Sequence, residues 1–238
     1  MFCVNVKYQS QEDVTMTINK VFLFVPNMLS YARILLYIGG FFLHTTGHWQ
    51  WCAILYTAGF LGDYWDGVAA RKLNQCSKFG AALEMVSDRT ATAGLCVILA
   101  HLYPRYIVVF ILLIALDIGS HYYLLYLTSL QGEKSHKDSG TQSEYRLLNA
   151  YYGNVTVLRL LVTGNEFFYI FLYSAYYAVG PGMSLFTKEF GGWQIAILIC
   201  LPFYVLKQWI NILQLKSSAG QIARIDLKER AKQKESAE

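Results

Sequence analysis

Four acidic residues stand near one another between apolar runs of the sequence. Asp63 and Asp66 are three positions apart, and Glu84 and Asp88 are four positions apart. On helices, each spacing places the two carboxylates on one face. Four negative charges beside lipid repel one another and resist desolvation, which a divalent cation relieves. Because carboxylate oxygens suit Mg²⁺ or Mn²⁺, and these ions bind phosphates, the four acids predict a metal centre for a phosphorylated substrate rather than unrelated acids solvated at helix ends.

The connection between the two acid pairs carries small and basic residues. Gly67 leaves room for a nucleotide against the helix backbone, Arg71 can hold phosphate in a forked contact, and Ser77 can donate its hydroxyl to phosphate. Taken alone, Gly67 also suits close helix packing, and Arg71 suits anchoring at lipid headgroups. The three residues therefore indicate nucleotide and phosphate binding because they lie between the two pairs of acids.

In their order and spacing these residues resemble the signature of the CDP-alcohol phosphatidyltransferases. Read from Asp63, the sequence runs Asp, two residues, Asp-Gly, two residues, Ala-Arg, eight residues, Gly, three residues, an acid, three residues, Asp. The third acid, normally Asp in the family, is Glu84 here. The resemblance implies that the four acids hold two ions of Mg²⁺ or Mn²⁺, that Asp88 is the catalytic base on the incoming alcohol, and that the glycine, arginine and serine above bind CDP-diacylglycerol.

Other stretches resemble the eukaryotic members of the family that use inositol. They are Phe22–Ile34, Ala69–Met85, Ser120-His121, Ser135-His136-Lys137 and Gly164–Phe167. This resemblance implies myo-inositol as the acceptor, a homodimer, and the endoplasmic reticulum membrane as the location. A polyol needs several hydrogen-bond partners, and the candidates for them are Asp117, His121, Ser135, His136, Lys137 and Glu166.

The composition indicates an integral membrane protein. Of 238 residues, 55% are hydrophobic and only 15% are charged, against about 25% charged in an average soluble domain. The net charge of +4 is mild, so no nucleic acid partner is expected. The five cysteines show no paired spacing, which predicts neither a zinc site nor a disulfide framework. No cleavable signal peptide is expected, because the first apolar run follows Glu12 and Asp13.

Long apolar runs predict an all-α bundle of six transmembrane helices. The short apolar run Val21–Val25, stopped by Pro26, predicts a small interfacial helix before the first span, which Asn27 is expected to cap. Polar cytosolic tails are predicted at residues 1–20 and 216–238, on either side of a transmembrane domain at 21–215. The predicted spans are Met28–His44, Trp49–Ala70, Phe79–Tyr103, Tyr106–Leu130, Val157–Val179 and Trp193–Leu215.

Basic residues predict the orientation of these spans. Arg71, Lys72 and Lys78 lie between the second and third spans, and Lys134 and Arg146 lie between the fourth and fifth. The opposite loops carry few basic residues. The positive-inside rule therefore places both termini and the four acids on the cytosolic side.

Several ionisable residues fall inside the predicted spans. Arg33 is costly in lipid unless it faces an acid or an aqueous cavity, and snorkelling to the headgroups is an equal alternative. Lys207 is expected to snorkel. Asp117 and His121, four positions apart, form either a polar wall for substrate or a buried pair that satisfies itself.

Two rival functions fit parts of the pattern. A family member with a phosphorylated acceptor, such as glycerol 3-phosphate or an inositol phosphate, needs a basic cluster at its pocket, and the second half offers only scattered basic residues. A cation transporter would use the acids as an ion path and predicts inverted repeats, of which the sequence gives no sign. Transfer to a neutral polyol is therefore favoured.

Overall fold

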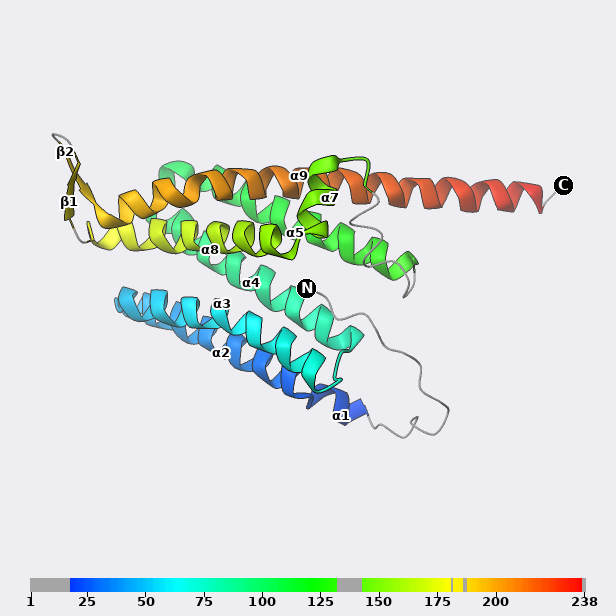
Figure 1. Ribbon diagram of the computed structural model, residues 1–238, viewed down its shortest axis with the longest axis horizontal. Coiled ribbons are helices and arrows are strands. Elements are labelled where there is room, and N and C mark those ends of the chain that lie inside the picture. Colours follow the sequence, from blue (N-terminus) through cyan, green and yellow to red (C-terminus); the bar gives the residue numbers. More distant parts are fainter. Residues whose placement is uncertain (1–17, 132–142, 181, 186–187, 237–238) are drawn as a thin grey trace. The chain divides into compact units, whose positions relative to one another are not determined.

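The computed structural model describes residues 18–131, 143–180, 182–185 and 188–236, with side chains for 20–131, 143–180 and 191–236. Within these ranges the chain is almost entirely helical (Figure 1). A short antiparallel hairpin pairs β1 (Gly182–Leu185) with β2 (Lys188–Gly191). The helices are α1 (Ile18–Phe22), α2 (Val25–Thr45), α3 (Trp49–Lys72), α4 (Lys78–Leu102), a 3₁₀ turn (Pro104–Tyr106), α5 (Ile107–Gln131), α7 (Arg146–Gly153), α8 (Val155–Tyr177) and α9 (Gly192–Glu235).

Six long helices lie in the six ranges where spans are predicted, and the all-α class is confirmed. Among the described residues, three segments are long and apolar enough to cross a membrane by length and composition: Pro104–Gln131, Val155–Tyr177 and Gly192–Glu235. The helices α2, α3 and α4 carry the polar residues of the candidate site. A count of six spans stays a prediction.

The start of the first long helix differs from the prediction. Helix α2 begins at Val25, and Pro26 lies in its first turn, where the missing N–H of proline costs no helical hydrogen bond. The cap position is Phe24, without a side-chain cap, so the expected capping role of Asn27 is wrong. Asn27 is buried, and its side-chain amide donates to the carbonyl of Val21 in the short helix α1 at 2.6 Å.

The chain divides into two compact units. Within the described residues, unit 1 comprises 18–110 and 166–199, and unit 2 comprises 111–165 and 200–236. In unit 1, α2 packs against α3 and α4. Glycines allow this approach, because a Cβ built on Gly59 would lie 2.7 Å from the ring of Tyr37, and one built on Gly94 would lie 2.5 Å from the ring of Phe41.

Unit 2 has an apolar cluster and a buried polar seam. Its apolar cluster joins Leu148, Tyr151, Leu161 and Ile210. Along one face of α9, four buried polar residues recur at helical spacing and face other parts of the unit. These are Lys207, Asn211, Gln214 and Ser218. Gln214 donates to the carbonyl of Ser120 at 3.0 Å and accepts from the Tyr152 hydroxyl at 2.5 Å. A satisfied polar seam of this kind suits helices that have lipid on their outer faces.

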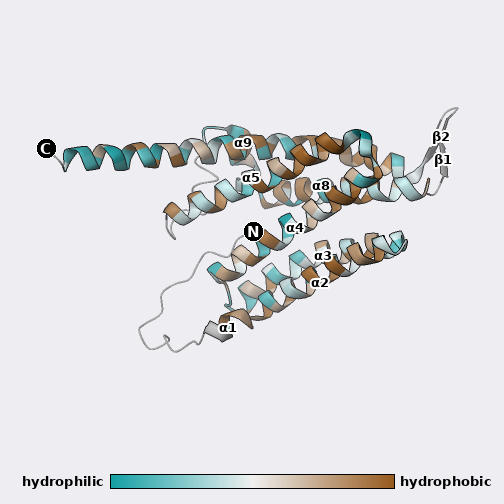
Figure 2. Cartoon of the chain, turned by 180° about the vertical axis from the view of Figure 1, so that it is seen from behind, coloured by the Kyte–Doolittle hydropathy of each residue, from teal (hydrophilic) through white to brown (hydrophobic). Residues whose placement is uncertain are grey.

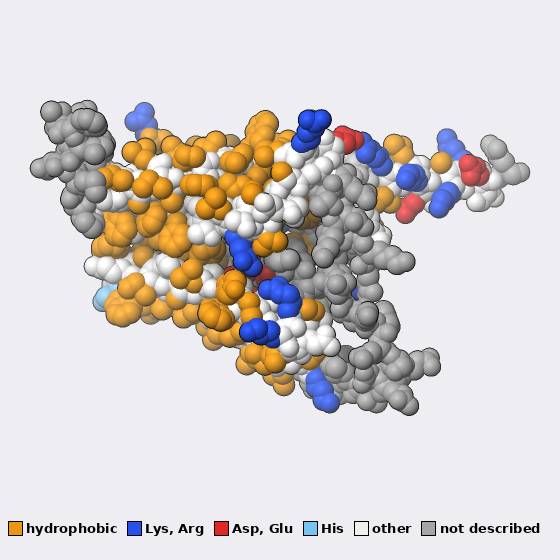
Figure 3. All heavy atoms as spheres, viewed as in Figure 1, with side chains coloured by type: hydrophobic (Ala, Val, Ile, Leu, Met, Phe, Trp, Pro, Cys, Tyr) orange, Lys and Arg blue, Asp and Glu red, His pale blue; other side chains and the backbone are white. Residues whose placement is uncertain are grey.

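The outer faces of the long helices are apolar. Leu35, Trp51, Leu112 and Val205 are each more than half exposed. Brown residues recur along the helices in Figure 2, and orange side chains cover them in Figure 3. The C-terminal part of α9 is instead hydrophilic, with basic and acidic side chains along it. Apolar surface on this scale is typical of helices in contact with lipid.

Candidate metal centre

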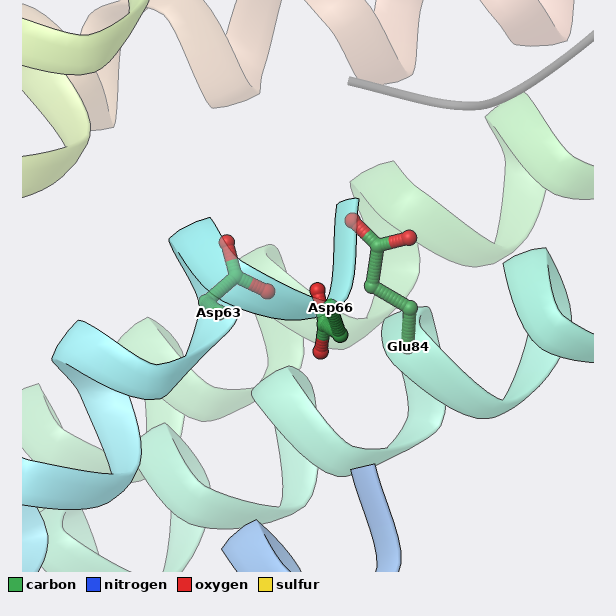
Figure 4. Close-up of side chains that lie close together, drawn as sticks. All are labelled: Asp63, Asp66 and Glu84. Atoms are coloured by element: carbon green, nitrogen blue, oxygen red, sulfur yellow. The ribbon is translucent and has the colours of Figure 1, made fainter. Parts of the chain in front are cut away.

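The candidate site lies where the second half of α3 faces the first half of α4. Asp63 and Asp66 come from α3, and Glu84 comes from α4 (Figure 4). One carboxylate oxygen from each of the three lies within 4.8 Å of the others. The predicted convergence of acids from two helices is thus present, and three oxygens at this separation can bind one divalent cation.

A short turn brings the two helices together. Helix α3 ends near Leu73, and Asn74 adopts a positive φ of 53°, a conformation that Asn tolerates better than most residues. Ser77 is the N-cap of α4, and its hydroxyl accepts from the amide of Gly80 at 2.9 Å. Ser77 therefore has a structural role, while its hydroxyl hydrogen is still available to donate to phosphate.

Arg33 of α2 reaches into the acidic cluster. Its Nη1 lies 2.9 Å from Oδ1 of Asp63 and 2.6 Å from Oδ2 of Asp66, and its Nη2 lies 2.5 Å from Oδ1 of Asp88. Its Nε donates to the carbonyl of Gly59 at 2.9 Å, and Arg33 is only 2% exposed. Of the two sequence-based alternatives, Arg33 faces acids and does not snorkel.

Asp66 supports the metal assignment independently of sequence spacing. This residue is 3% exposed, and its Oδ2 accepts from Arg33 and, at 3.3 Å, from the Ser30 hydroxyl. Its Oδ1 has no hydrogen-bond partner among the described residues. A buried carboxylate oxygen without a donor is costly, and a cation satisfies it. The residues present therefore fit a divalent metal ion.

The net negative charge of the cluster also favours binding of a cation. Four carboxylates and the two guanidinium groups that pair with them, those of Arg33 and Arg89, give a formal charge of −4 + 2 = −2. Asp88 is held by Arg33 at Oδ1, its Oδ2 lies 3.8 Å from Nη2 of Arg89, and its side chain is 26% exposed. The arrangement can bind a cation and an anionic substrate group through that cation.

The residues predicted to bind CDP lie at the end of α3 next to the acids. Arg71 is exposed and folds back over Gly67, where a Cβ would lie 3.5 Å from its Nη1. Arg71 and Gly67 are thus neighbours one turn apart on α3. An exposed guanidinium beside a metal centre can contact a phosphate that the metal also contacts.

The described candidates for acceptor binding belong to two different units of the chain. Glu166 belongs to unit 1, is 5% exposed, and accepts from the Tyr56 hydroxyl at 2.7 Å and from the Thr92 hydroxyl at 3.2 Å. Asp117 and His121 belong to unit 2, where Nδ1 of His121 lies 3.6 Å from Oδ1 of Asp117. The remaining three, Ser135, His136 and Lys137, lie outside the described residues.

Sequence reasoning missed the environment of Lys207. The prediction that it snorkels is wrong, because Lys207 is 3% exposed, donates to Oδ1 of Asn211, and lies 5.8 Å from the ring centroid of Tyr151. Asn211 in turn donates to Oδ1 of Asp117 at 3.4 Å. The signal in the sequence was the recurrence of Lys207, Asn211 and Gln214 on one helical face of an apolar run.

The fold and the site define a class of protein: a membrane protein with a partly buried acidic centre at the junction of two helices. The chain belongs to the CDP-alcohol phosphatidyltransferase family, whose model matches residues 23–163, including all four acids. Members of this family are in general metal-dependent. No solved structure matches the chain significantly.

The similar curated proteins are CDP-diacylglycerol–inositol 3-phosphatidyltransferases. The Schizosaccharomyces pombe enzyme is 36% identical over 88% of this chain and 93% of its own length. The Saccharomyces cerevisiae enzyme is 39% identical over 89% of this chain and 91% of its own length. The human enzyme is 35% identical over 90% of this chain and 98% of its own length. The similarity therefore extends well beyond the acidic motif.

Proposed function

We propose that this protein transfers the phosphatidyl group of CDP-diacylglycerol to myo-inositol, giving phosphatidylinositol and CMP. The observation that carries the proposal is the convergence of Asp63, Asp66 and Glu84 inside the segment that matches the family. The acceptor follows from the relatives, whose names specify inositol. Similarity over about nine-tenths of the chain supports a shared acceptor as well as a shared donor.

The reaction is a substitution at the phosphorus nearest the lipid. The inositol oxygen forms a bond to that phosphorus, the bond to the CMP oxygen breaks, and CMP leaves with the bonding electrons. A divalent ion held by Asp63, Asp66 and Glu84 would offset the negative charge that builds on the pyrophosphate oxygens.

Asp88 takes the proton of the acceptor hydroxyl. Its Oδ1 is held by Arg33, and its Oδ2, which lies 3.8 Å from Nη2 of Arg89, is the oxygen that accepts the proton. In-line displacement puts the acceptor opposite the leaving group, so the inositol pocket lies across the metal centre from CMP. Gly67, Arg71 and Ser77 contact the CDP moiety in this proposal.

The proposal also covers the metal ions, the membrane topology and the oligomeric state. Two ions of Mg²⁺ or Mn²⁺ bind, six helices span the endoplasmic reticulum membrane, a short N-terminal helix lies in the interface, and the chain forms a homodimer. Both termini and the acids face the cytosol, where the soluble inositol is supplied. Glu166, Asp117, His121 and the segment Ser135–Lys137 are the candidates that contact it.

The test supplies purified protein with CDP-diacylglycerol and one acceptor at a time: inositol, glycerol 3-phosphate, serine or choline. Inositol alone is expected to give CMP together with a new lipid, and a Glu84→Gln variant is the inactive control. A lipid product with glycerol 3-phosphate and none with inositol would replace the proposed acceptor. Cation flux into sealed vesicles without release of CMP would reject the enzyme.

A further inference from the structure

The proposed function uses Arg33 only as a neighbour of Asp88, yet Arg33 contacts three of the four acids. Its guanidinium lies between Asp63 and Asp66 of α3 and Asp88 of α4. One side chain from α2 thus joins the two helices that supply the acids.

Two glycines of α3 accommodate the side chain of Arg33. A Cβ built on Gly62 would lie 3.1 Å from Cγ and 3.3 Å from Cδ of Arg33, so the glycine lets the arginine stem pass along α3. The carbonyl of Gly59 accepts from Nε and fixes the plane of the guanidinium. Three fixed hydrogen-bonding directions make a lysine a poor substitute here.

Arg33 and the candidate cation share Asp66 between them. Its Oδ2 contacts Arg33, and its Oδ1 is the buried oxygen without a hydrogen-bond partner among the described residues. A carboxylate can bridge a guanidinium and a metal ion in this manner, with one oxygen for each. Asp66 therefore has a permanent positive charge at one oxygen and an unsatisfied acceptor at the other, to which an exchangeable cation can bind.

We propose that Arg33 is a positioning residue that acts as a built-in cation: it holds Asp66 and Asp88 and limits the repulsion among the acids before a divalent ion binds. The expected effect of Arg33 on turnover rests on the proposed function. Its expected effect on the stability of the metal-free protein does not. Without Arg33 the formal charge of the cluster, with Arg89 counted, changes from −2 to −3, so the cluster depends more strongly on divalent ions for its stability.

The first experiment measures thermal unfolding of the detergent-solubilised full chain with no substrate, once in EDTA and once with Mg²⁺. In Arg33→Met, the difference between the two midpoints is expected to exceed that of the wild type by about 4 °C or more. The matched control is Arg105→Met, which removes an exposed arginine in the turn after α4 and should keep the wild-type difference. A purely structural role of Arg33 would lower both midpoints equally, and that result would overturn the proposal.

The second experiment uses Arg33→Lys, which keeps the charge and loses the forked contacts. Its metal-dependent midpoint difference should stay close to that of the wild type. Its kcat is expected to fall about 10-fold to 100-fold, with a smaller change in KM for CDP-diacylglycerol, because Asp88 is no longer held in place. Wild-type kcat in this variant would overturn the positioning role.

A double variant covers the case in which Arg33→Met does not fold. Arg33→Met with Asp88→Asn removes one positive and one negative charge, which restores the wild-type formal charge of −2. Recovery of folded protein in EDTA supports the proposal, and a failure to recover contradicts it. Because these unfolding measurements contain no inositol or nucleotide, they stand even if the acceptor proves to be a different alcohol.

Discussion

At the scale of single residues, the candidate centre combines acids that sequence spacing can group with an arginine that it cannot. The helical period alone places Asp63 with Asp66, and Glu84 with Asp88, on shared helix faces. The partner of Arg33 depends on where α2 crosses α3, and that crossing is set by Gly59 and Gly62 through packing. Local patterns do not contain that information, which is why the sequence supports two alternatives for Arg33 equally well.

Asp88→Asn separates substrate binding from turnover. The amide keeps an oxygen that can accept from Nη2 of Arg33, so the local packing is preserved. It cannot take a proton, and kcat for CMP release is expected to fall by about 100-fold to 10,000-fold, the usual range for loss of a general base. Binding of CDP-diacylglycerol, measured by titration with Mg²⁺ present, should change little. Near-normal turnover would refute the assignment of the base, and Asp226→Asn, at an exposed position of α9, is the control.

Glu84→Asp tests the one acid that departs from the family pattern. The shorter side chain draws its oxygens back toward α4, and the expected kcat stays within about threefold of the wild type or rises, since the family normally carries Asp here. Glu84→Gln keeps the length but loses the charge, and should cost at least about 10-fold to 100-fold in metal affinity. Loss of activity in Glu84→Asp would mean that the centre has adapted to the longer residue.

At the scale of elements, the apolar runs predicted the six long helices because a span requires about 20 apolar residues in sequence. Three smaller features were not predicted from the sequence: the hairpin of β1 and β2, the amphipathic helix α7, and the first turn of α2. Each is short, so its pattern is too weak to predict. Helix α9 also continues to Glu235 through the predicted tail, since residues after Leu215 are good helix formers with no breaker beyond Gly220.

Gly94→Ala tests how closely α4 approaches α2. A Cβ at this position would lie 2.5 Å from the ring of Phe41, and the overpacking is expected to cost about 1–3 kcal/mol in the free energy of unfolding. Adding Phe41→Leu should recover part of the loss, as measured by thermal unfolding. Gly119→Ala in α5 is the matched control, because no atom lies within 4 Å of its Cβ position. Equal stability of Gly94→Ala and Gly119→Ala would contradict the close approach.

At the scale of the whole molecule, orientation follows from charge rather than from packing. Epitopes at both termini are expected to be digested by protease added outside sealed endoplasmic reticulum vesicles, whereas an epitope between β1 and β2 should be protected until detergent is added. The basic residues Arg71, Lys72 and Lys78 around the turn after α3 predict this orientation. Protected termini with an exposed hairpin would reverse the predicted topology and place the acids on the lumenal side.

The 44 residues of α9 form one unbroken helix, which at 1.5 Å per residue is about 66 Å long, roughly twice the thickness of the hydrocarbon layer. If the span ends near Leu215 as the sequence predicts, about 30 Å of helix continues beyond that point. A fluorophore attached at the C-terminus would therefore sit at the end of a stiff spacer. Energy transfer from it to a dye in the headgroups should be weaker than from a fluorophore on the turn after α3.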